Sequence, residues 1–129
     1  MPEVEIFVAA FVREWGIASD EASRILILLE ELITNLTKYG YRDRPECGRA
    51  EIVLALHGGR LEIEFIDDGC EFDPLAAPPP NLEEPLETRT PGGLGLHIVR
   101  SLTDEARYER RNNTNVILLS RIVVSTRTS

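Results

Sequence analysis

The sequence has few cysteines and no long apolar run. Cys47 and Cys70 are its only cysteines, and neither belongs to a Cys-x-x-Cys pair or a Cys/His cluster, so we expect no zinc site. Two isolated cysteines are typical of reduced thiols in a cytosolic protein, although the sequence leaves a disulfide between them open. No stretch approaches the roughly 18 apolar residues that a membrane span needs, and no signal peptide is recognisable. We therefore expect a cytoplasmic protein that does not bind a membrane.

Basic residues are also in short supply. The chain has 14 Lys and Arg against 22 Asp and Glu, which gives a formal net charge of −8. This balance argues against nucleic acid as a partner, because a phosphate backbone demands a surplus of positive side chains. At 129 residues, with 43% hydrophobic and 28% charged residues, the chain is expected to form one compact domain over residues 1–129.

Apolar residues recur at helical spacing in two stretches near the N-terminus. They predict amphipathic helices over residues 3–15 and from about residue 20 to Tyr39, each followed by a glycine that ends it. Ser19 and Asp20 are expected to cap the N-terminus of the second helix. A third helix is expected over residues 96–102.

Alternating apolar residues predict two β-hairpins, one around Gly58-Gly59 and one around Asn112-Asn113. The expected strands span residues 50–56, 61–65, 106–110 and 115–124. Residues 125–129 should form a frayed tail. Hairpins and helices in this order predict an α/β fold, a two-layer α/β sandwich whose mainly antiparallel sheet is covered by helices on one face.

The second predicted helix has a stripe of polar side chains beside its buried face. Asn35 lies about 40° from Glu31 around the helix axis, and Lys38 lies about 20° to the other side of Glu31. An acid, a neutral oxygen ligand and a cation in one row are what a magnesium-phosphate site requires. The alternative is a solvated stripe with an ion pair, and this helix alone does not decide between the two.

Two further motifs follow along the chain. An acidic turn, Asp67-Asp68-Gly69, comes directly after a predicted strand, although such turns are common. Residues 74–91 contain six of the eight prolines and are expected to form a lid or a disordered segment. They lead into Gly92-Gly93-Leu94-Gly95, where backbone amides at a helix N-terminus would form a phosphate cradle. A flexible hinge is the alternative reading of these glycines.

Taken in order, Glu-x-x-x-Asn, Asp-x-Gly and Gly-Gly-Leu-Gly-Leu resemble the GHKL superfamily of ATP-binding domains (Bergerat fold), which includes gyrase, Hsp90, histidine kinases and MutL. The short chain, Asp-Asp-Gly-x-x-Phe-Asp-Pro and Gly-Gly-Leu-Gly-Leu-His-Ile-Val resemble the anti-sigma-factor serine kinases within it. The resemblance covers roughly residues 20–120. It implies that ATP and Mg²⁺ are the cofactors and that residues 74–91 are the ATP lid.

The resemblance also implies a role for each motif residue. Glu31 matches the general base that accepts a proton from the attacking hydroxyl or water, and Asn35 matches the magnesium ligand. Lys38 matches a position beside the phosphates. Asp67 matches the acceptor of a hydrogen bond from the adenine amino group, and Gly69 matches the glycine that lets the backbone approach the base.

At the end of the lid, Gly93, Leu94 and Gly95 match the turn whose amides meet the phosphates. Arg89, just before this turn, is a candidate contact to the γ-phosphate. The sequence departs from the family pattern at Glu71, where relatives commonly have a second glycine.

By this resemblance, the protein phosphorylates a serine or threonine of a small anti-anti-sigma (STAS-like) protein and sequesters a sigma factor. The alternative is a nucleotide-controlled binding module without useful phosphotransfer. A homodimer remains open, because the chain begins with a predicted helix where we expect relatives to have a strand. Neither a sensor histidine kinase nor a DNA-linked ATPase is expected, since the sequence lacks the segments that those proteins add to this domain.

Overall fold

The computed structural model describes residues 2–37, 49–76 and 93–123. The predicted order of helices and hairpins is confirmed, with a short 3₁₀ turn before the third helix. Within the described ranges, no helix combines the length and the apolar character that crossing a bilayer requires. The elements are α1 (Pro2–Glu14), α2 (Ser19–Asn35), β1 (Ala50–His57), β2 (Arg60–Asp67), η2 (Pro74–Ala76), α3 (Gly93–Leu102), β3 (Glu105–Arg111) and β4 (Thr114–Ile122).

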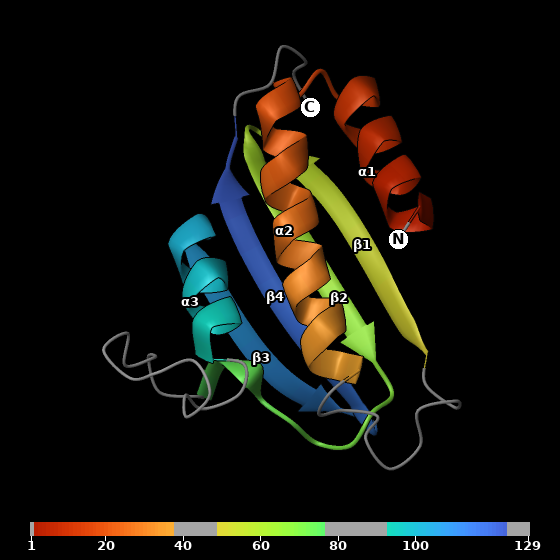
Figure 1. The fold of residues 1–129 in the computed structure, drawn as a ribbon, viewed down its shortest axis with the longest axis vertical. Coiled ribbons are helices and arrows are strands. Elements are labelled where there is room, and N and C mark those ends of the chain that lie inside the picture. The colour runs from red at the N-terminus through yellow and green to blue at the C-terminus, as the bar shows by residue number, and fades with distance from the viewer. Residues whose placement is uncertain (1, 38–48, 77–92, 124–129) are drawn as a thin grey trace.

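The strands form one antiparallel sheet in the order β1-β2-β4-β3, with α1, α2 and α3 on one of its faces (Figure 1). The predicted two-layer α/β sandwich is therefore confirmed. The two hairpins meet along β2 and β4, whose register places Asp67 directly opposite Asn115. This pairing joins parts of the chain that are far apart in the sequence.

Both hairpin turns use the left-handed backbone conformation at their two central residues. The φ angles are 57° and 84° at Gly58 and Gly59, and 51° and 66° at Asn112 and Asn113. Glycine has no Cβ to oppose a positive φ, and asparagine tolerates it better than most residues. The two-residue turns predicted from these pairs are thus confirmed.

The hydrophobic core lies between the sheet and α2, with contributions from α1 and α3. Side chains that alternate along β2 and β4 meet the apolar stripe of α2. Burying a side chain of this size stabilises the fold by about 2 kcal/mol. The core includes Val8, Val12, Ile25, Leu28, Leu29, Leu32, Leu61, Ile63, Phe65, Val99, Ile117 and Leu119.

The start of α2 differs from its prediction. The N-cap residue is Ala18, which makes no side-chain capping hydrogen bond, so Ser19 and Asp20 already lie within the helix. The Asp20 carboxylate instead pairs with Arg24 one turn later, at 3.3 Å. At the other end, α2 reaches Asn35 and residues 36–37 form a π-helical turn. The predicted continuation to Tyr39 lies outside the described residues.

An ion pair connects the first turn of α2 to β4. The Arg121 guanidinium donates through Nε to Glu21 Oε2 at 2.8 Å and through Nη2 to Glu21 Oε1 at 3.1 Å. Through Nη1 it donates to the carbonyl oxygen of Leu102, the last residue of α3, at 2.8 Å. One side chain therefore holds α2, α3 and β4 together. The hydrogen bonds from Arg121 to Glu21 are the main reason that the pKa of Glu21 is lowered, and burial of Glu21 opposes this shift.

Replacing Arg121 by methionine should lower the free energy of unfolding by about 3 kcal/mol at pH 7, because Glu21 keeps its burial and loses its main partner. Since the pKa of Glu21 is lowered in the folded state, the stabilisation is complete above about pH 4.5 and is lost as the pH falls through the folded-state pKa. Urea denaturation at pH 7 and at a series of pH values below 4.5 measures both effects.

The control is Glu105→Gln, which removes the charge of an exposed pair with Arg60 and leaves the hydrogen bond from Arg60 to Ser120 in place, and it should cost less than about 1 kcal/mol. A similar loss of stability in both variants, or a wild-type advantage that does not shrink as the pH falls below 4.5, would contradict this account of the ion pair.

Candidate functional site

The last two turns of α2 carry the predicted acid and amide. Asn35 is 6% exposed, and its carboxamide makes no hydrogen bond with a described residue. Glu31, one turn earlier, is half-buried and likewise pairs with no described side chain. Because buried polar groups nearly always have a partner, the amide of Asn35 is unusual for a structural residue.

Asp67 ends β2 and is 5% exposed. Its Oδ1 accepts hydrogen bonds from the Gly69 N–H and from Nδ2 of Asn115, both at 2.9 Å. Its Oδ2 accepts none from the described part of the chain. Burial raises the pKa of Asp67, and the hydrogen bonds from Asn115 and Gly69 oppose this rise. One oxygen of a buried carboxylate is thus fully engaged, while the other is left as an acceptor.

A narrow hollow brings Asn35 and Asp67 together from α2 and β2. Its free volume is ≈ 10 Å³, about that of one water-sized probe, so a larger ligand requires the lining side chains to move apart. It is lined by Leu32, Asn35, Leu36, Phe65, Asp67, Phe72, Pro74, Asn115 and Ile117. Two of the predicted site residues therefore share one apolar hollow.

Three residues of the β3–β4 hairpin complete the site and were missed from the sequence. Asn115 Nδ2 donates to the Cys70 carbonyl at 2.8 Å as well as to Asp67. Asn115 Oδ1 accepts from the Tyr108 hydroxyl at 2.6 Å and from Arg110 Nη1 at 3.1 Å. The signal that could have revealed them is their place in the strand alternation, since all three are polar at positions that face the helices.

The predicted glycine cradle is described only for its backbone. α3 begins at Gly93, so Gly93, Leu94 and Gly95 form its first turn, where backbone N–H groups have no partner within the helix. Figure 1 shows that α3 begins at the end of the molecule where α2 ends. The predictions for Lys38 and Arg89 fall outside the described residues.

The beginning of the predicted lid is packed against the domain. Pro74–Ala76 form the 3₁₀ turn η2, and Pro74 is buried and lines the hollow. Arg100 of α3 donates a hydrogen bond to the carbonyl oxygen of Leu75. Residues 77–91 of the lid prediction are outside the described ranges. Glu71, which replaces the second glycine of the family motif, is exposed and does not line the hollow.

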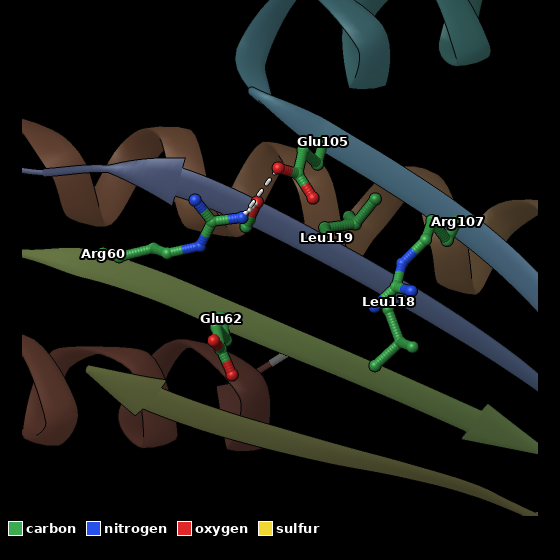
Figure 2. A pocket seen from close by; sticks show the side chains of 7 residues that line it. Arg60, Glu62, Glu105, Arg107, Leu118 and Leu119 are labelled. Atoms are coloured by element: carbon green, nitrogen blue, oxygen red, sulfur yellow. Dashed lines mark hydrogen bonds and ion pairs between the residues drawn. The ribbon is translucent and has the colours of Figure 1, made fainter. Parts of the chain in front are cut away.

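A second hollow of ≈ 90 Å³ lies elsewhere on the sheet and shares no residue with the first. Figure 2 shows Arg60 reaching across β4 toward Glu105, with which it pairs at 3.1 Å. Arg60 Nη2 also donates to Ser120 Oγ at 2.9 Å. The charged residues that line this second hollow lie at outward-facing positions of the strands, and the hollow contains none of the predicted site residues.

The described residues contain no group of three or more His, Cys, Asp and Glu side chains that could hold a metal ion. Asn35 and Asp67 both line the hollow, and Asn35 supplies the neutral amide oxygen that accepts no hydrogen bond from a described residue. A single amide ligand suits Mg²⁺, which is bound through one or two protein oxygens together with water and phosphate oxygens. The donor set of the site therefore fits a metal that arrives with a phosphate ligand.

Comparisons with known proteins identify the family of this domain. A family model described as the histidine kinase-like ATPase domain matches residues 1–121. The chain is 26% identical over 119 residues to the serine-protein kinase RsbW of Bacillus thuringiensis (strain Al Hakam) and to that of Bacillus cereus (strain 03BB102). Each of these alignments covers 89% of this chain and 73% of the relative.

Two solved structures share the fold. One is the histidine kinase domain of the blue-light activated histidine kinase from Erythrobacter litoralis EL346, with a TM-score of 0.52, 22% identity, and coverage of 79% of this chain and 44% of that one. The other is that histidine kinase itself, with a TM-score of 0.59, 20% identity, and coverage of 83% and 32%. The chain thus spans less than half of either structure.

The Asp67→Asn variant should be more stable than the wild type at pH 7, because an amide oxygen can accept the same two hydrogen bonds without a buried charge. The raised pKa means that the unfolded state loses its proton first, so wild-type stability falls relative to the variant as the pH rises above 3.8. Thermal denaturation across pH 3 to 7 measures the difference.

Glu51→Gln, at an exposed position of β1, is the control and should change stability by less than about 0.5 kcal/mol. An Asp67→Asn variant that is less stable than the wild type at pH 7 would show that the charge of Asp67 supports the fold.

Proposed function

Because the chain belongs to the family of histidine kinase-like ATPase domains, we propose that it is an ATP-dependent serine/threonine protein kinase of the anti-sigma-factor type. One observation carries the proposal. Asp67 and Asn35 are buried and line the same hollow, and neither Asp67 Oδ2 nor the Asn35 carboxamide has a hydrogen-bond partner among the described residues. A bound ligand would supply these partners. The similarity to the RsbW serine-protein kinases supports this reading.

Asp67 is proposed to bind the base. Its ionised Oδ2 would accept a hydrogen bond from the exocyclic amino group of adenine. Guanine carries a carbonyl oxygen at the corresponding position, which would face the carboxylate as a second acceptor and leave both groups unpaired. Gly69 follows in a tight turn held by Asp67 itself, and its lack of a side chain would let the base approach the backbone.

The phosphate groups are assigned to the ends of two helices. Asn35 would hold Mg²⁺, which supplies charge neutralisation to the triphosphate when it is bound. The backbone N–H groups of Gly93, Leu94 and Gly95 would meet the phosphates at the N-terminus of α3. Lys38, Arg89 and residues 74–91 as a lid complete the proposed set. Of these, Lys38, Arg89 and residues 77–91 lie outside the described ranges.

Glu31 is proposed as the general base. It would accept the proton of the serine or threonine hydroxyl while that oxygen forms a bond to the γ-phosphorus. The bond from the γ-phosphorus to the β–γ bridging oxygen breaks, and ADP leaves. Because such transfer depends mainly on positioning and electrostatic stabilisation, a half-buried carboxylate one turn from Asn35 can serve as the general base.

The proposed protein substrate is a small anti-anti-sigma (STAS-like) antagonist, and the proposed second partner is a sigma factor. The direct test is incubation of the protein with γ-labelled ATP, Mg²⁺ and a lysate of its own organism. A small labelled protein that appears only with active kinase would establish transfer and identify the substrate. Measurable ATP binding without any transfer would indicate a nucleotide-controlled binding module instead.

Glu31→Ala should retain ATP affinity and lower the rate of phosphotransfer about 10²–10⁴-fold, as is typical for loss of a general base. Binding is measured by calorimetry and transfer with labelled ATP. Glu30→Ala is a matched control, because Glu30 is exposed and lies about 100° around the helix. Normal transfer by Glu31→Ala would remove Glu31 from this role.

Asn35→Ala should weaken ATP binding about tenfold when Mg²⁺ is present and leave it nearly unchanged in EDTA, because the lost ligand acts through the metal. Thr34→Ala, at an exposed neighbouring position of α2, should behave as the wild type under both conditions. An equal loss of affinity with and without Mg²⁺ would contradict the assignment of Asn35 as a metal ligand.

A further inference from the structure

Asn115 uses every hydrogen-bonding group of its side chain, although it is only 2% exposed. Its two N–H groups reach Asp67 Oδ1 at 2.9 Å and the Cys70 carbonyl at 2.8 Å. Its carbonyl oxygen accepts from Tyr108 and Arg110, with a longer contact of 3.4 Å from the Phe72 N–H. A fully satisfied buried amide has one fixed position.

The orientation of this amide follows from its neighbours. Arg110 and the Phe72 N–H are donors only, so the oxygen of Asn115 must face them. Its NH₂ group is consequently directed at Asp67 and at the Cys70 carbonyl. A flipped amide would place donors against donors on one side and an oxygen against a carboxylate on the other.

The same side chains hold the turn that follows Asp67. Arg110 Nη1 donates to the Gly69 carbonyl at 2.9 Å. Together with the contacts of Asn115 to Cys70 and Phe72, this hydrogen bond holds three residues of the turn against the β3–β4 hairpin. Phe72 itself lines the hollow, so the hairpin sets both the carboxylate and one wall of the site.

We propose that Asn115, oriented by Arg110 and Tyr108, is a positioning residue that decides which oxygen of Asp67 faces the ligand and thereby sets the preference for adenine over guanine. Asn115 occupies Oδ1 from the β4 side, together with the Gly69 N–H, and this leaves Oδ2 as the acceptor for a ligand. This inference rests on the proposed function, because it assumes that a purine base binds at Asp67.

The hydrogen bond from Asn115 also favours the ionised form of Asp67. Burial has the largest effect on the pKa of the Asp67 carboxyl group and raises it. The charge of Asp68 also raises this pKa, and the charge of Arg110 lowers it. The titratable Tyr108 lies on the far side of the Asn115 amide. If Asp67 were protonated, its Oδ2 would become a donor that suits the guanine carbonyl rather than the adenine amino group. Nucleotide preference should therefore depend on pH.

The test is the ratio of ATP to GTP affinity, measured by calorimetry from pH 4 to pH 8 for the wild type and for Asn115→Ala. Using the ratio cancels the titration of the phosphates. The wild type should prefer ATP at neutral pH and lose this preference as the pH falls. Asn115→Ala should lower the ratio about tenfold at pH 7, the effect of one hydrogen bond to a charged group, and move the midpoint to higher pH.

The matched control is Ser120→Ala, which also removes a buried hydrogen bond from β4 but at Arg60, away from the site. It should leave the ratio and the midpoint unchanged. If Asn115→Ala does not fold, Asn115→Val replaces it under the same expectation, because valine suits a strand and has no donor for Asp67 Oδ1.

A folded variant with the wild-type ratio and midpoint would overturn the inference while the proposed function stands. An equal loss of affinity for both nucleotides, with an unchanged midpoint, would also overturn it, since that is the effect of a purely structural residue. A wild type that binds neither nucleotide, or does not prefer ATP, would instead contradict the proposed function itself.

Discussion

The hydrogen bond between Asp67 and Asn115 is the interaction on which the site depends. It joins the last residue of β2 to its partner in β4, and so it exists only if the two hairpins pair in the observed register. A slip of one residue between β2 and β4 would place the two side chains on opposite faces of the sheet. The sheet therefore does more than support the site, because its register decides which polar groups meet inside it.

This arrangement lowers the stability of the fold, because it buries the carboxyl group of Asp67. Burial raises the pKa of its carboxyl group, and a residue chosen only for stability would be apolar or neutral at this position. Asn35 is similar, since its buried amide has no described partner. Elsewhere the domain is conventionally stabilised, with an apolar core between α2 and the sheet and an ion pair from Glu21 to Arg121. The unfavourable groups are concentrated where a ligand would satisfy them.

Much of the fold follows from local patterns. Alternation and turn residues predicted both hairpins, and helical spacing predicted α1 and α2, because these signals lie within a few residues of one another. The cap of α2 was wrong because Asp20 pairs with Arg24 rather than with the backbone. Asn35 and Asp67 could be proposed from their motifs, but Asn115 could not, since its contact with Asp67 spans 48 residues and depends on the order of strands in the sheet. The roles of all the predicted site residues stay predictions, and Lys38 and Arg89 lie outside the described residues.

The most direct measurement of the central claim is a crystal structure with a non-hydrolysable ATP analogue and Mg²⁺. The account predicts the adenine amino group about 2.9 Å from Asp67 Oδ2, with Asn115 still bonded to Oδ1 and the metal against the Asn35 oxygen. A nucleotide bound elsewhere, or a base that makes no hydrogen bond to Asp67, would contradict it.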